Sequence, residues 1–202
     1  MTYKTNRQYR SMALLMPTDY RLLESDHYVE GYATTFDEPY LLYEYEGNKY
    51  FEVIAREALL EADLSDVIMQ YDHEGKVLAR LSNNTLALVS DEHGLKIGAD
   101  LSKSVAAREM HDEIINGLVT KMSWAFTVTE DSYNKETRTN TISKIRKVYD
   151  VSAVSYPANS DTEISARSWL DGVIEAEKRE ALEQQAALKL AQAKYFYYGE
   201  RN

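Results

Sequence analysis

The chain has 202 residues, a length that suits one domain with a sizeable core, and it contains no cysteine. Disulfides, a thiolate nucleophile and cysteine-based metal sites are therefore excluded. The net charge of -10 at pH 7 argues against a nucleic-acid partner, because a phosphate-binding surface needs an excess of Lys and Arg. The longest apolar run near the start, Met12 to Met16, is too short for a membrane span, so we expect no membrane association.

Three regions differ in composition. Residues 1–25 are mixed and aperiodic, and we expect them to form an N-terminal arm. Residues 26–160 are rich in β-branched and aromatic residues and carry frequent turn signals, which indicates the main β domain. Residues 161–202 are dominated by Ala, Glu, Gln, Lys and Leu, which predicts a C-terminal helical tail.

In the middle region, two-residue turn signals separate pairs of strand-like segments. Gly47-Asn48 and Asn83-Asn84 each predict a hairpin. The paired segments are Leu41–Glu46 with Lys49–Ile54, and Val77–Ser82 with Thr85–Ser90. Leu95–Leu101 then alternates with period two, so a meander of three strands is expected.

The spacing of apolar residues predicts two helices and one long strand. Ser104 is expected to cap a helix whose apolar residues recur at helical spacing and which Gly117 ends. A shorter helix is expected from Arg56 to Leu64, and a strand over Val119–Thr129. The whole pattern predicts an α+β, mainly β protein: a closed or nearly closed β structure with peripheral helices and a C-terminal helix.

A hydroxyl nucleophile and a base are both present in suitable places. Ser123 lies mid-strand on a face of small residues, where a peptide backbone could approach closely. His73, one of four histidines, stands at the end of the apolar strand Val67–Tyr71 and before the glycine turn at Gly75. Each residue also has a plain structural interpretation, a packing serine and a solvated turn histidine, and spacing alone does not choose between them.

Asp150 is the candidate for the third residue of the site, the one that would hold the base in its working tautomer. It shares strand parity with Val148 and Val154, and a carboxylate on an apolar face needs a partner such as an imidazole N–H. The alternative is an edge-strand carboxylate that faces water.

Three segments, in this order, resemble the tailed-phage prohead protease family. The first extends from the helix at 55–64 through Asp72-His73-Glu74 to Glu92-His93-Gly94-Leu95. The second is Gly117–Phe126, with Lys-Met-Ser-Trp-Ala-Phe around Ser123, and the third is Val148–Ala158. The resemblance covers about residues 28–167. The nucleophile segment departs from the commoner family pattern, which has Gly where Ala125 stands and often Phe where Trp124 stands.

The resemblance implies a fold similar to the herpesvirus capsid-maturation proteases, a β-barrel wrapped by helices. It implies Ser123 as nucleophile, His73 as general base and Asp150 as the residue that orients the base. The herpesvirus enzymes use a second histidine in that third role. No cofactor or metal is implied.

The same resemblance implies a serine endopeptidase that cleaves the scaffold segment of the phage major capsid protein during assembly. Because the enzyme's own chain is the substrate at the highest effective concentration in a closed shell, we expect it to cleave itself as well. Such an enzyme works in the host cytoplasm inside the procapsid, and it is compatible with a homo-oligomer.

Two other classes compete with this interpretation. One is a catalytically inactive, scaffold-like assembly protein, which would not need Ser123 and His73 as a pair. The other is a metal-dependent hydrolase built from His73, His93, His111 and nearby carboxylates, but no His-x-x-x-His or comparable spacing exists.

Overall fold

The computed structural model describes residues 8–15, 21–45, 47–155, 178–180 and 182–189. In this part of the chain, strands dominate, so the expected mainly β class is confirmed. The strands are β1 Gln8–Leu15, β2 Tyr28–Thr35, β3 Tyr40–Tyr45, β4 Asn48–Ile54, β5 Ile68–Tyr71, β6 Glu74–Arg80, β7 Leu86–Ser90, β8 Gly94–Asp100, β9 Lys121–Asn134 and β10 Thr139–Val154. Within residues 21–155 the helices are α1 Val105–Ile115 and the short 3-10 turns η1 Arg56–Leu59 and η2 Leu81–Asn83.

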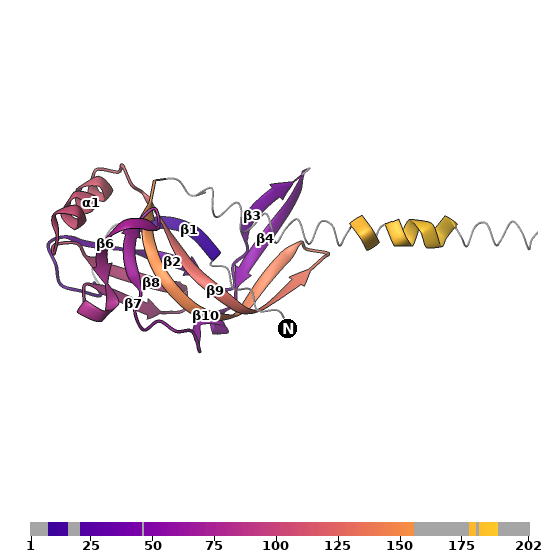
Figure 1. The fold of residues 1–202 in the computed structure, drawn as a ribbon, viewed down its shortest axis with the longest axis horizontal. Coiled ribbons are helices and arrows are strands. Elements are labelled where there is room, and N and C mark those ends of the chain that lie inside the picture. Colours follow the sequence, from indigo (N-terminus) through magenta and orange to yellow (C-terminus); the bar gives the residue numbers. More distant parts are fainter. Residues whose placement is uncertain (1–7, 16–20, 46, 156–177, 181, 190–202) are drawn as a thin grey trace, which may run out of the picture. The chain divides into compact units, whose positions relative to one another are not determined.

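The strands form one sheet in the order β3-β4-β10-β9-β1-β2-β8-β7. The hairpin of β5 and β6 branches from this path, since β5 pairs in parallel with β10 beyond the end of β4. β9 and β10 are the longest strands and run beside each other through the middle (Figure 1). Among the described residues no pairing joins β6 to β7, so the expected closed barrel is not seen in the hydrogen bonding.

The segment expected as an N-terminal arm contributes a strand. β1 pairs with β9 through residues 8–13 and with β2 through residues 14–15, and it thereby joins the two halves of the sheet. Buried Arg10 forms an ion pair with buried Glu52 of β4, and the hydroxyl of Tyr40 donates to the same carboxylate. Moving β1 away from β4 would break this pair and leave an uncompensated buried charge, which is strongly unfavourable. The contact therefore helps to hold β1 in the sheet.

One of the two expected hairpins is confirmed and the other is wrong. β3 and β4 pair across Gly47, whose positive φ of 77° suits the turn. By contrast, β6 and β7 do not pair: η2 lies between them, and the partner of β7 among the described strands is β8. Asn84 does take the left-handed conformation expected of it, but as the residue that ends η2.

The helix predicted after Ser104 is confirmed, including its end at Gly117, which has a positive φ of 73°, whereas the helix predicted from Arg56 is too long. The Ser104 side chain accepts a hydrogen bond from Ala107 N–H, as an N-cap should, and the buried face of α1 is formed by Ala107, Met110 and Ile114. Leu118 lies beyond the helix and is 75% exposed. The helix expected from Arg56 to Leu64 is reduced to the single turn η1.

The core lies on one face of β9 and β10. Met122, Trp124 and Phe126 of β9 are fully buried, and the rings of Trp124 and Phe126 lie 4.2 Å apart. On β10, Ile145, Val148 and Val151 are buried as well. Packing of this density fixes the position of β9, on which Ser123 stands.

Contacts within the chain divide it into two compact units, Met1–Glu163 and Ile164–Asn202. In the second unit, residues 178–180 and 182–189 are helical and exposed, with Leu182 and Leu188 on the surface. The remainder of the tail expected over 161–202 lies outside the described residues. No helix in the described part of the chain is long and apolar enough to cross a membrane.

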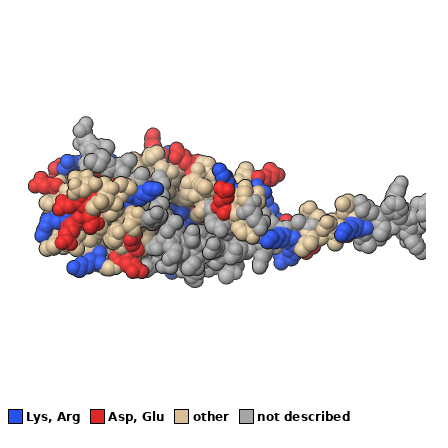
Figure 2. All heavy atoms as spheres, turned by 90° about the horizontal axis from the view of Figure 1, so that it is seen from above, with Lys and Arg blue, Asp and Glu red and all other residues tan. Residues whose placement is uncertain are grey.

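Acidic and basic side chains are interspersed on the face of the first unit shown in Figure 2. Surface ion pairs join neighbouring strands and turns of this unit, such as Lys144 with Glu61 at 2.5 Å and Lys147 with Asp63 at 2.7 Å, whichever face they lie on. Exposed pairs of this kind add little to stability.

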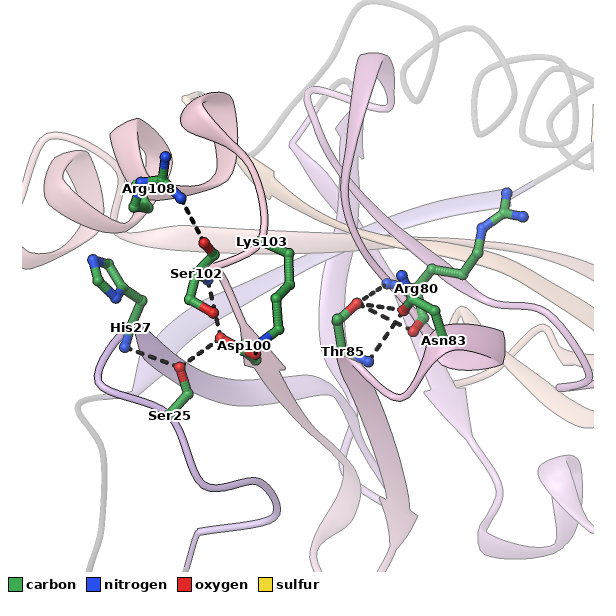
Figure 3. Close-up of polar contacts among 9 residues, drawn as sticks. All are labelled: Ser25, His27, Arg80, Asn83, Thr85, Asp100, Ser102, Lys103 and Arg108. Carbon is green, nitrogen blue, oxygen red and sulfur yellow. Dashed lines mark hydrogen bonds and ion pairs between the residues drawn. The ribbon is translucent and has the colours of Figure 1, made fainter.

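The carboxylate of Asp100, at the end of β8, contacts both the loop before β2 and the loop that leads into α1 (Figure 3). Its Oδ1 accepts hydrogen bonds from Ser25 Oγ at 2.5 Å and from Ser102 N–H at 3.0 Å, and its Oδ2 lies 3.1 Å from Lys103 Nζ. Burial raises the pKa of Asp100, but the hydrogen bonds from Ser25, Ser102 and Lys103 outweigh it and hold the pKa well below its usual range. The carboxylate therefore stabilises the loop before β2 and the loop that leads into α1.

We expect Asp100 to contribute to stability in a pH-dependent manner. Because its pKa is depressed in the folded state, its contribution is full above the unfolded value of about 3.9 and is lost as pH falls below it. The Asp100→Asn variant should melt at a lower temperature than wild type at pH 7, and the gap should narrow between about pH 4 and pH 2. Thermal melts across this range test it, and a constant gap would show that ionisation of Asp100 contributes nothing.

Candidate active site

Ser123 lies where β9 is paired on both sides. Its backbone is opposite Ser152 of β10 and Ser11 of β1, so the position of its Cα is fixed by two neighbouring strands. Since side chains alternate along a strand, the burial of Met122 and Trp124 in the core directs Ser123 to the opposite face. Ala125 shares that face, which keeps it lined by small side chains.

His73 is carried by a tight turn. Tyr71 pairs with Glu74, which leaves Asp72 and His73 as the two central residues of the hairpin between β5 and β6. Both have positive φ, 45° and 61°, as a type I′ turn requires. Asn-Gly is the usual sequence there, and each residue other than glycine costs about 1–3 kcal/mol in this conformation. The sequence predicts a turn at Gly75, after His73. In the structure the turn comes earlier: His73 is itself a turn residue, and Gly75 belongs to β6.

Asp150 reaches the site because β10 contains a bulge. Val148 lies opposite Phe126, but Asp150 lies opposite Ala125, so one extra residue of β10 is inserted at Tyr149. Directly paired residues share a face, which places Val148 with the core and Asp150 with Ser123. The expectation that Asp150 and Val148 share a face is therefore wrong, because the bulge reverses the alternation between them.

The three side chains form one hydrogen-bonded chain. His73 Nε2 lies 2.8 Å from Ser123 Oγ, and His73 Nδ1 lies 2.5 Å from Asp150 Oδ1. A carboxylate can only accept, so the hydrogen is on Nδ1 and the lone pair of Nε2 is left to accept the Ser123 hydroxyl hydrogen. Only 6% of the His73 side chain and 4% of the Asp150 side chain are exposed, which shields both contacts from water.

Sequence reasoning missed Ser152. Its hydroxyl donates to Asp150 Oδ1 at 2.8 Å, and the residue is fully buried. Ser152 therefore fixes the same carboxylate oxygen that contacts His73. The available signal was strand periodicity, since a residue two positions after Asp150 lies on the same face.

The other histidines lie elsewhere. His93 is in the turn before β8, with its ring 4.6 Å from that of Tyr32, and His111 is on α1, with its ring 4.9 Å from that of His27. Within the described ranges, no group of three or more His, Asp or Glu side chains is arranged to hold a metal ion. The structure therefore does not bring together the residues that the metal-hydrolase alternative requires.

A Ser-His-Asp chain on a β-sheet is the arrangement found in serine hydrolases. Comparison with protein families gives the more specific assignment: the family described as caudovirus prohead serine protease matches residues 17–173. The chain belongs to the prohead serine protease family of tailed phages. No curated protein and no solved structure matches the chain significantly.

Proposed function

We propose that this chain is the prohead maturation endopeptidase that removes the scaffold segment of the phage major capsid protein during assembly. The observation that carries the proposal is the continuous hydrogen-bonded chain from Ser123 through His73 to Asp150. Membership of the prohead serine protease family supports both the reaction and the substrate class. By the same reasoning we place the enzyme inside the procapsid, in the host cytoplasm. The likeness to the herpesvirus fold and a boundary between the protease domain and the C-terminal tail at residue 160 belong to this proposal as well.

The proposed mechanism follows from the geometry. His73 Nε2 takes the hydroxyl proton of Ser123 as Oγ attacks the carbonyl carbon of the peptide bond. The proton then passes to the departing amine as the C–N bond breaks, which leaves the acyl group on Ser123 Oγ. A water molecule, deprotonated by His73, then attacks the acyl carbonyl, and Ser123 leaves with that proton. Asp150 keeps the hydrogen of His73 on Nδ1 and stabilises the imidazolium that forms.

Co-expression with the major capsid protein tests the proposal. Shells assembled with the wild-type chain should contain capsid protein shortened at one end, and shells assembled with the Ser123→Ala variant should contain it at full length. Mass spectrometry of the capsid protein from purified shells gives the answer. Full-length capsid protein in wild-type shells would refute the proposed substrate.

Self-cleavage is a separate expectation. In a closed shell, the enzyme's own chain is the substrate at the highest effective concentration. We therefore expect wild-type protein from procapsids to lose a C-terminal segment, whereas the Ser123→Ala variant retains all 202 residues. Intact-mass measurement on both decides it. An unshortened wild-type chain in shells with cleaved capsid protein would reject self-cleavage and leave the protease assignment in place.

A further inference from the structure

The turn that carries His73 is fastened to the end of β10 by the side chain of Asp72. Oδ1 of Asp72 accepts a hydrogen bond from Ser155 N–H at 3.1 Å, and Oδ2 accepts one from Ser155 Oγ–H at 2.9 Å. In addition, Asp72 N–H donates to the carbonyl of Ala153 at 2.9 Å. Ser155 directly follows β10, so these three bonds join the tip of the β5–β6 hairpin to the strand that carries Asp150.

This fastening has a geometric consequence for the imidazole. His73 follows Asp72 in the turn, and its ring must reach back to Asp150 and across to Ser123. Both central residues of the turn are in the left-handed region, a conformation that is less favourable for Asp and His than for glycine. A turn of this kind persists only when its surroundings hold it, and the Asp72 carboxylate provides two of the bonds that do so.

We propose that Asp72 is a positioning residue: its carboxylate clamps the turn to Ser155 and thereby holds the His73 ring between Ser123 and Asp150. The inference rests on the proposed role of His73 as the base. Asp72 itself contacts neither Ser123 nor Asp150 through any of these bonds, so it acts on the reaction only through the position of its neighbour.

The alternative is that Asp72 matters only for the turn conformation, and two substitutions separate the two roles. Glycine adopts positive φ without strain, so Asp72→Gly favours the turn but removes both acceptor oxygens. Asparagine also tolerates positive φ and keeps Oδ1 as an acceptor for Ser155 N–H. A clamp therefore predicts that Asp72→Asn is closer to wild type than Asp72→Gly, whereas a role in the turn conformation alone predicts the reverse or no difference.

Ser155→Ala removes one bond of the clamp from the other side and leaves the turn sequence intact. Asp37→Gly is the matched control. Asp37 also has positive φ, 57°, and its Oδ1 also accepts a backbone N–H, that of Arg56 at 3.2 Å. It lies between β2 and β3, and its hydrogen bonds are with Ile54 and Arg56, not with the turn of His73.

The experiment measures two quantities on each full-length variant. The first is the rate at which a fluorophosphonate probe modifies the protein, which reports how well His73 activates Ser123. The second is the downfield ¹H NMR resonance of the His73 Nδ1 hydrogen, which requires the contact with Asp150 and needs no activity. Thermal melts are recorded alongside to show that each variant is folded.

We expect Asp72→Gly to react about ten- to a hundred-fold more slowly, because a shift of about 1 Å in a catalytic group can cost up to about 10²-fold. Its Nδ1 resonance should broaden or disappear, while its melting temperature stays near that of wild type. Asp72→Asn and Ser155→Ala should lie between, and Asp37→Gly should match wild type in both measurements.

If Asp72→Gly keeps both the wild-type rate and the resonance, the inference is wrong and the proposed protease stands. If the probe does not modify the wild-type chain, but the resonance is still lost in Asp72→Gly and kept in Asp37→Gly, positioning by Asp72 stands and the proposed protease fails.

Discussion

Ser123→Ala should abolish cleavage of the capsid protein and leave the fold intact. Removing the nucleophile of a serine protease lowers the turnover rate by up to about 10⁶-fold, since the covalent pathway is lost and only binding and oxyanion stabilisation remain. The Ser123 hydroxyl forms a hydrogen bond with His73 Nε2. Because a single hydrogen bond contributes about 1 kcal/mol net, its loss should change the free energy of unfolding by about that amount. Circular dichroism spectra of the variant should therefore overlay on those of wild type, and its melting temperature should differ by about 4 °C at most.

Ser132→Ala is a suitable control for this variant. Ser132 is on the same strand, β9, and is exposed. We expect it to retain wild-type cleavage. Normal processing of capsid protein by Ser123→Ala would end the assignment of Ser123 as nucleophile.

Asp150→Asn should nearly abolish activity while preserving shape. The carboxylate accepts the hydrogen on His73 Nδ1, whereas an amide nitrogen in the same place donates and favours the tautomer with the hydrogen on Nε2. Nε2 then cannot accept the proton of Ser123, and a loss of about 10⁴-fold in turnover is expected from this effect in a Ser-His-Asp triad. His73→Ala, which removes the base itself, should lose at least as much.

Asp66→Asn serves as the control for charge, because Asp66 forms an exposed ion pair with Arg80 at 3.3 Å. It should be fully active. If Asp150→Asn were fully active while His93→Ala was dead, the third member of the triad would have been assigned to the wrong residue.

Local patterns in the sequence predicted many of the elements, because local physics determines them. The cap at Ser104, the period-two alternation of β8 and the hairpin of β3 and β4 each depend on residues close together in the chain. β1 was missed for the opposite reason. Its sequence is aperiodic, and it becomes a strand because β9 and β2 offer it hydrogen-bonding partners far along the chain.

The candidate site was found by residue type and resemblance, but its geometry depends on two irregularities that leave little trace in sequence. The bulge at Tyr149 reverses strand parity and directs Asp150 toward Ser123. The turn at Asp72-His73 lacks the glycine that usually marks its type, so the pattern placed the turn too late. Both irregularities are tolerated because contacts across β5, β9 and β10 hold them.

The roles of Ser123, His73 and Asp150 stay predictions until chemistry is measured, although the structure brings the three side chains into contact. Ser152 and Asp72 belong to the same account. One fixes the carboxylate of Asp150, and the other fastens the turn of His73. Asp72 could not be chosen from sequence, since its role depends on a contact with a separate segment of the chain, whereas strand periodicity indicated that Ser152 shares a face with Asp150.

Covalent labelling is the most direct test of the central claim, that Ser123 is a nucleophile activated by His73. Wild-type protein is treated with a fluorophosphonate probe, digested, and analysed by mass spectrometry to locate the adduct. We predict one adduct per chain on Ser123, and none on the Ser123→Ala or His73→Ala variants. An adduct on a different residue, or none on a wild-type chain that cleaves its capsid protein, would contradict the account.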